Sequence, residues 1–211
     1  MNSLAVQRQS SHDAKDRSFV GEPVEQLLRA SQKPISIDEV SLLVRSLEEN
    51  ITHFPLPGRG KTLSRWRALA ALGAFDLSVA KLLESHFDAL AIMDEARFIP
   101  KPGVYGVWAS KFEGRFLSAK RSGDLWRVSG DLAFASGIST VEYAIVPVKT
   151  ESGEQLFEIP RSAVTATDRS RWNTPGMVQA DTAWISVDAL LPDSSRVGEI
   201  GFYLDRPGFW A

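Results

Sequence analysis

The chain has 211 residues, 44% of them apolar, and a formal net charge of −2 at pH 7. This length and composition allow one large domain or two small ones with a substantial buried core. The near-neutral charge, without long lysine or arginine blocks, argues against nucleic acid as a partner. Because the chain has no cysteine, disulfide scaffolds, thiol nucleophiles and thiolate metal sites are excluded.

The ends of the chain and its hydropathy predict the cellular location. No stretch approaches the roughly 18 to 20 consecutive apolar residues that a membrane-spanning helix needs. The polar start of the sequence has no apolar signal-peptide centre. We therefore expect a soluble, cytoplasmic protein with no membrane partner. Residues 1–20 lack hydrophobic periodicity, and we expect them to be flexible.

Helices are expected first along the chain. The segment 22–30 has apolar residues at helical spacing behind a proline that suits a first helical turn. Ser36 and Glu39 have the spacing of a capping box, and the apolar stripe behind them predicts a second helix that ends near Asn50. The Pro- and Gly-rich segment 51–61 predicts a loop.

A longer helical region follows over residues 63–96. It is rich in Ala and Leu, and Gly73 and Asp76 indicate a break into two helices. The second helix has an apolar face that should pack against the other helices. His86 lies beside this face, where a lone histidine is more typical of packing than of a metal or catalytic site. Closely spaced prolines in 98–103 end the helical region.

From residue 104 the sequence changes to the pattern of strands. Short aromatic and β-branched runs bounded by Gly, Ser and Asp fill 104–160 and recur at 162–167 and 182–187. Ser122–Asp124 predicts a tight hairpin turn, because its central glycine takes positive φ at little cost. About seven or eight strands joined by short turns indicate an antiparallel sandwich or a small barrel.

The predicted fold class is therefore α+β: an N-terminal α-helical domain over 21–103, then an antiparallel β-sandwich or barrel domain over 104–205. The sequence has no triad pattern, no metal-ligand spacing and no glycine-rich dinucleotide turn, so no catalytic or metal-binding residue is predicted. Aromatic and small polar residues at adjacent strand ends suit either the wall of a pocket for a flat ring or the β-domain core. They are Tyr105, Trp108, Phe134, Ser136, Ser139 and Thr140.

Several phrases of the sequence resemble the acyl-CoA dehydrogenase family. Gly123–Gly130 (GDLWRVSG), followed by Phe134–Ile138 (FASGI), is similar to the family's middle-domain pattern before the flavin wall. Tyr105–Ala109 lies where the family has a Y-x-V/L-T-E-P segment. The similarity continues backwards through Gly58–Thr62 and 66–90, which resemble the last helices of the family's N-terminal domain.

The similarity also continues forwards. Trp172–Met177 resembles a W-x-x-x-G-M loop of the family, and 206–211 resembles the beginning of its C-terminal helical domain. The resemblance implies a chain with the N-terminal and middle domains but without that C-terminal domain. In the family, the C-terminal domain supplies the catalytic glutamate and completes both the FAD site and the tetramer.

The resemblance further implies FAD as the cofactor, with its ring lined by Tyr105, Val107, Trp108, Phe134 and Ser136. The implied activity is the oxidation of the CH–CH group of an acyl-CoA, by a flavoprotein that is incomplete or one part of a split enzyme. A homo-oligomer, or a partner chain that supplies the C-terminal helical domain, is implied with it. Two alternatives stay open: a non-catalytic module that binds acyl-CoA or another small ligand, and an interaction protein whose bare faces dock a partner.

Overall fold

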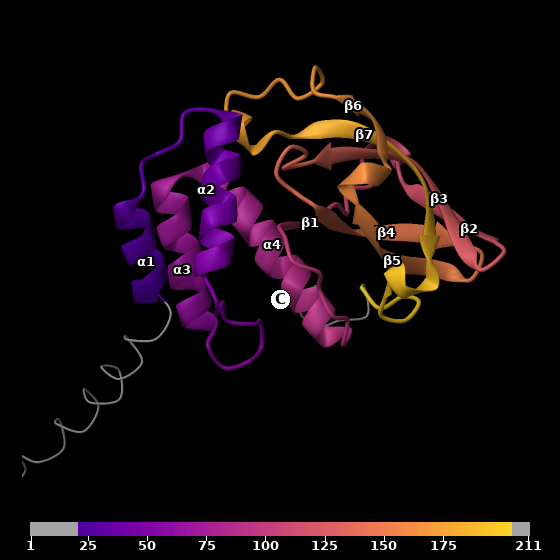
Figure 1. The fold of residues 1–211 in the computed structure, drawn as a ribbon, viewed down its shortest axis with the longest axis horizontal. Helices are drawn as coiled ribbons and strands as arrows, with labels where there is room; N and C mark the ends of the chain where they lie inside the picture. The colour runs from indigo at the N-terminus through magenta and orange to yellow at the C-terminus, as the bar shows by residue number, and fades with distance from the viewer. Residues whose placement is uncertain (1–20, 204–211) are drawn as a thin grey trace, which may run out of the picture.

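The computed structural model describes residues 21–203, in which helices precede a β-sheet (Figure 1). The expected flexible segment 1–20 and the segment 206–211 lie outside the described residues. The architecture is α+β, as predicted. Its helices are α1 (Gly21–Ala30), α2 (Ile37–Asn50), α3 (Thr62–Phe75) and α4 (Leu77–Glu95).

Side-chain caps set the starts of two helices. The Ser36 hydroxyl accepts a hydrogen bond from the backbone N–H of Glu39, as the predicted capping box requires, while the Glu39 carboxylate accepts from the Ile35 N–H and not from Ser36. The Asp76 carboxylate accepts from two backbone N–H groups of the first turn of α4. Gly73 stays inside α3, so the break between the two helices is made at Asp76 and not at the glycine.

The strands form one sheet that is mostly antiparallel, in the order β6-β7-β3-β2-β4-β5-β8, with β1 beside β4. The predicted turn joins β2 to β3, and Gly123 in it has a φ of 61°. The strands are β1 (Tyr105–Val107), β2 (Leu117–Ser122), β3 (Leu125–Ala135), β4 (Tyr143–Thr150), β5 (Gly153–Pro160), β6 (Val164–Asp168), β7 (Ala183–Pro192) and β8 (Arg196–Val197).

Two strand pairings are parallel, a feature that the expected antiparallel domain did not include. Strands β1 and β2 both run parallel to β4 and pair with successive parts of it. They therefore act as one interrupted strand, and residues 108–116 leave the sheet between them. This excursion contains the short 3₁₀ helix η2 (Phe112–Gly114).

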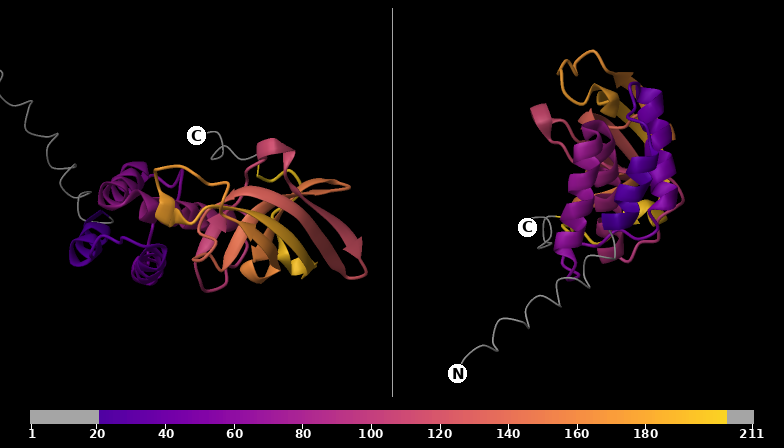
Figure 2. Two further views of the ribbon diagram at one scale, coloured as in Figure 1. Left: turned by 90° about the horizontal axis from the view of Figure 1, so that it is seen from above. Right: turned by 90° about the vertical axis from the view of Figure 1, so that its left-hand side faces the viewer.

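Helix α4 lies between the other helices and the sheet (Figures 1 and 2). Its residue Leu82 and the sheet residues Val128 and Phe157 are buried in the same hydrophobic cluster, so the core is continuous from the helices to the sheet. The predicted domain boundary at residue 103 falls between α4 and β1, and the division into two domains stays a prediction. Within residues 21–203, no helix is both long and apolar enough to cross a membrane.

Two glycines should respond in opposite ways to alanine. Gly73 lies inside α3 with no atom within 4 Å of an added Cβ, so Gly73→Ala should stabilise the fold by roughly 0.5–1 kcal/mol through lower backbone entropy. Gly130 has a φ of +140°, and a Cβ there would lie 2.4 Å from the Phe116 carbonyl oxygen. Gly130→Ala should therefore destabilise it. Urea unfolding measures the free energy of unfolding of both variants. A change of the same sign in both would contradict the different backbone conformations of Gly73 and Gly130.

Candidate functional site

The end of β3 is irregular, and two of the predicted site residues lie there. The register between β3 and β7 shifts between Leu132 and Ala135. Phe134, inside this shift, has a φ of 62°, in the left-handed region that bulky residues rarely adopt. Irregularities of this kind redirect a side chain, and they occur often beside functional sites. Ser136 follows directly after the strand.

The redirected Phe134 ring is the centre of an aromatic cluster, which we define as Phe112, Phe134, Trp172 and Trp184. The Phe134 centroid lies 4.9 Å from that of Phe112 and 4.9 Å from that of Trp184. It lies 5.7 Å from the Trp172 centroid. The four rings come from η2, β3, the connection after β6, and β7. Because Phe112 is 46% exposed, the cluster reaches the surface.

Two indole N–H groups in the aromatic cluster lack a hydrogen-bond acceptor. The Nε1 atoms of Trp172 and Trp184 are buried, and no partner for either is found among residues 21–203. A buried donor without a partner costs about 1–3 kcal/mol. Such groups are rare in native proteins, and each calls for an explanation such as a bound molecule. Unpaired donors beside a ring face match a flat ligand that carries acceptor atoms along its edge.

Neither tryptophan was predicted as a site residue. Trp172 was noted only as part of a family-like loop, and Trp184 has the sequence context of an ordinary strand residue. Arg171 adds a positive charge here: its guanidinium lies 4.8 Å from the Trp184 ring centroid and is 3.0 Å from the Glu113 carboxylate. The only signal in the sequence was the dipeptide Arg171–Trp172 in a polar loop.

Ser136 is connected to another predicted residue, Trp108. The Ser136 hydroxyl lies 2.9 Å from that of Thr182, and its backbone carbonyl accepts a hydrogen bond of 3.0 Å from Trp108 Nε1. Trp108 itself is only 2% exposed. Because its N–H is already paired, Trp108 positions the segment after β3 and offers a ligand no free donor.

Tyr105 and Val107 are not brought to the aromatic cluster. Tyr105 has no exposed surface, and its hydroxyl donates to Glu158 Oε1 at 2.6 Å. Burial, and then this hydrogen bond, raise the pKa of Tyr105 far above its usual range. Both residues pack in a hydrophobic cluster separate from that of Trp108. Their role as flavin-lining residues stays a prediction.

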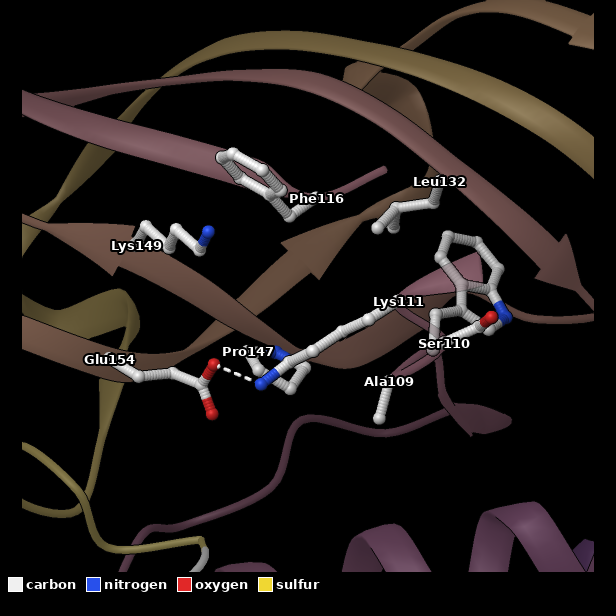
Figure 3. Close-up of a pocket in the computed structure, with 9 residues that line it drawn as sticks. Ala109, Ser110, Lys111, Phe116, Leu132, Pro147, Lys149 and Glu154 are labelled. Carbon is white, nitrogen blue, oxygen red and sulfur yellow. Dashed lines mark hydrogen bonds and ion pairs between the residues drawn. The ribbon is translucent and has the colours of Figure 1, made fainter. Parts of the chain in front are cut away.

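A small pocket beside Trp108 is too small to be the ligand site (Figure 3). Its volume of 10 Å³ is about what one water molecule needs, against roughly 300–1,000 Å³ for ligand pockets. Lys111 reaches across it to Glu154, with an Nζ–Oε2 distance of 2.6 Å. This pocket is therefore excluded as the site of a flat-ring ligand. In the described part of the chain, no group of three or more His, Asp or Glu side chains is placed to hold a metal.

Asp181 clamps the segment that carries Ser136. Its carboxylate is 2% exposed and accepts hydrogen bonds from Arg169 Nε at 2.6 Å and from the Ser139 backbone N–H at 3.1 Å. Burial acts to raise the pKa of Asp181, but the hydrogen bonds from Arg169 and Ser139 outweigh it and hold the pKa below its usual 3.8. The Gly137 N–H also donates to the neighbouring Ala180 carbonyl. These contacts fix Ser136 beside Thr182.

Comparison with known proteins finds similarity in structure alone. No protein-family model matches the sequence, and no curated protein sequence matches it. The fold is similar to that of glutaryl-CoA dehydrogenase from Mycobacterium smegmatis, with a TM-score of 0.65 and 18% identity, over 87% of this chain and 55% of that one.

The fold is also similar to two other solved structures. TdsC from Paenibacillus sp. A11-2, solved with FMN and indole, has a TM-score of 0.59 and 17% identity, over 87% of this chain and 54% of that one. The HsaA monooxygenase from M. tuberculosis has a TM-score of 0.56 and 14% identity, over 85% and 53%. This chain thus spans about half the length of the proteins it matches and has the acyl-CoA dehydrogenase fold over the shared part.

Removing the Asp181 carboxylate should test the clamp. Asp181→Ala should lower the free energy of unfolding by about 1–3 kcal/mol, because Arg169 and Ser139 lose a buried, charged acceptor. The folded-state pKa is below 3.8, so this stabilisation is complete above pH 3.8 and is lost as the pH falls through the lower folded-state value. The difference between wild type and variant should therefore shrink only under strongly acidic conditions. Urea unfolding from pH 7 to pH 3 measures it.

Asp188→Ala provides the control, since the Asp188–Arg127 pair is about half exposed at 2.8 Å and such pairs contribute about 0–1 kcal/mol. Equal losses in the two variants would contradict the clamp.

Proposed function

We propose that this chain, which has the fold of the acyl-CoA dehydrogenases, binds a flavin at the aromatic cluster and acts in a flavoprotein oxidoreductase. The observation that carries the proposal is the pair of unpaired, buried N–H groups of Trp172 and Trp184 next to the Phe134 ring. An isoalloxazine ring is flat, and its pyrimidine end carries carbonyl and ring-nitrogen acceptors. It thus matches both the ring faces and the donors.

The residues present fit a flavin in four ways. Phe134 would supply a ring face for stacking, Ser136 a hydroxyl, and the two tryptophans N–H donors for acceptor atoms. The Arg171 guanidinium, whose charge is balanced by Glu113, would supply a further N–H donor beside Trp184. Bound flavin supplies the redox chemistry; the chain orients it and excludes water from one side. The aromatic rings shield that side, because Trp184 is only 8% exposed.

FAD is the flavin we propose, on the family resemblance, with an acyl-CoA as the substrate. A glutaryl-CoA dehydrogenase of M. smegmatis was solved with FADH2, whereas TdsC was solved with FMN. FMN is therefore the competitor for the same site. Some similar structures are monooxygenases. The acyl-CoA substrate is therefore proposed on the family resemblance alone.

The chemistry requires a base. Three glutamates of the β-region, Glu113, Glu142 and Glu158, are each paired with a cation, namely Arg171, Arg45 and Lys101. We therefore propose that the base and the rest of the flavin site come from a second copy or from a partner chain.

A cytoplasmic location is part of the same proposal. A non-catalytic ligand-binding module remains the alternative, and flavin binding without acyl-CoA turnover by the complete assembly would favour it.

The two tryptophan donors can be tested one at a time. Trp172→Phe and Trp184→Phe keep an aromatic ring and remove the N–H, so each should raise the dissociation constant of FAD about two- to tenfold. Titration of flavin fluorescence and absorbance, with FAD and with FMN in parallel, measures the affinity. Trp126→Phe is the matched control, because Trp126 Nε1 donates to exposed Asp193 at 2.9 Å. Unchanged affinity in both cluster variants would place the flavin elsewhere.

Removing the ring face and the hydroxyl together should have a larger effect. The double substitution Phe134→Ala with Ser136→Ala should lower the flavin occupancy of the purified protein while far-UV circular dichroism stays unchanged. The chain offers a control with the same spacing, Phe116→Ala just before β2 with Ser118→Ala on β2, which should retain the flavin. Equal occupancy in the two double variants would mean that Phe134 and Ser136 do not line the ring.

A further inference from the structure

A second cavity lies between α4 and the loop that joins α2 to α3. Its volume is 440 Å³, within the roughly 300–1,000 Å³ typical of small-molecule sites. It shares no lining residue with the aromatic cluster. Nothing in the flavin proposal uses it.

Five apolar residues form much of the wall of this cavity, and the polar residues Glu48, Thr52, His53 and His86 complete its lining. Ile51, Phe54 and Leu56 form the loop side, and Phe87 and Leu90 form the α4 side. The Phe54 ring stacks on Phe87 with a centroid distance of 3.8 Å. The loop is also tied to α3, because buried Arg65 donates to the Pro55 carbonyl at 2.9 Å. The cavity is therefore bounded by packed elements on both sides.

His86 also lines the cavity, and one of its ring nitrogens has no partner. The side chain is 3% exposed, and its Nδ1 accepts a hydrogen bond of 3.1 Å from the Tyr105 backbone N–H. Nδ1 is thus unprotonated, and the neutral ring carries its proton on Nε2. Burial lowers the pKa of His86 to about 4, so the ring is neutral at pH 7. No hydrogen bond of Nε2 is found within residues 21–203.

Charges near the cavity restrict what can enter it. Glu48 lies at its edge, and burial, followed by the charges of Glu49 and Glu142, raises its pKa against the opposing effect of Arg45. No lysine or arginine is among the described residues that line the cavity. An anion would meet carboxylate charge without a paired cation, so the cavity suits an uncharged ligand.

We propose that this cavity binds a small uncharged molecule that has an apolar ring and one oxygen acceptor. The oxygen accepts the hydrogen bond of His86 Nε2–H, and the ring packs between the loop side and Phe87 and Leu90. An aromatic ketone has this chemistry. The unpaired Nε2–H of His86 in the cavity lining explains why the oxygen favours binding, and the apolar side chains of the lining explain why the rest of the molecule is a hydrocarbon.

Acetophenone is the probe, and ethylbenzene, which has the same ring without the oxygen, is the matched control ligand. Proton–nitrogen NMR spectra of the full chain follow each titration. Acetophenone should shift the His86 Nε2–H signal and the amide signals of 51–54 and Leu56, and ethylbenzene should bind about two- to tenfold more weakly. An absence of shifts at these positions, or equal affinity for the two probes, would overturn the proposal.

A variant that fills the cavity gives a second test. Leu56→Trp adds bulk inside the cavity without altering the hydrogen bond between His86 and Tyr105, and it should weaken acetophenone binding by about tenfold or more. Leu42→Trp is the control, because Leu42 is 69% exposed on α2. Undiminished binding by the folded Leu56 variant would also overturn the proposal. The shift mapping on the unmodified chain decides the question if that variant does not fold.

Discussion

The contact between α4 and β1 determines where the other parts of the molecule lie. One edge of β1 pairs with β4 in parallel. At the other edge no strand lies within residues 21–203; instead, the Ser85 hydroxyl accepts from the Val107 N–H at 2.8 Å and His86 Nδ1 accepts from the Tyr105 N–H. Helix side chains thus satisfy backbone donors that would otherwise be unpaired in the core. The helical part and the sheet are coupled by hydrogen bonds as well as by apolar packing.

The segment between β1 and β2 connects the α4–β1 contact to the aromatic cluster. Residues 108–116 leave the sheet there, which places Trp108 to hold the Ser136 carbonyl and places Phe112 against Phe134. Asp181 holds the same segment from the other side. The position of the candidate flavin site therefore depends on an edge strand of only three residues.

The helices and the β2–β3 turn were predictable because their signals are local: a cap, a helical period and a glycine at positive φ. The direction of the Phe134 ring was not, since it follows from a register shift between β3 and β7, strands about fifty residues apart. Tyr105, Trp108 and Phe134 are all aromatic, so the sequence favoured the core for all three and could not separate a pocket residue from them. In the structure Tyr105 and Trp108 are buried, whereas Phe134 belongs to a cluster that reaches the surface.

Each candidate site contains N–H donors that the described chain leaves without an acceptor, although only those of the aromatic cluster are buried. At the aromatic cluster the donors are the indoles of Trp172 and Trp184, and at the α4 cavity the donor is His86 Nε2. The cost of an unpaired donor falls on the folded state, so a ligand that supplies an acceptor recovers it as binding free energy. Because β1 is hydrogen-bonded to His86 and is followed directly by Trp108, disturbing β1 affects both sites. Substitutions in the wall of one site leave the other intact.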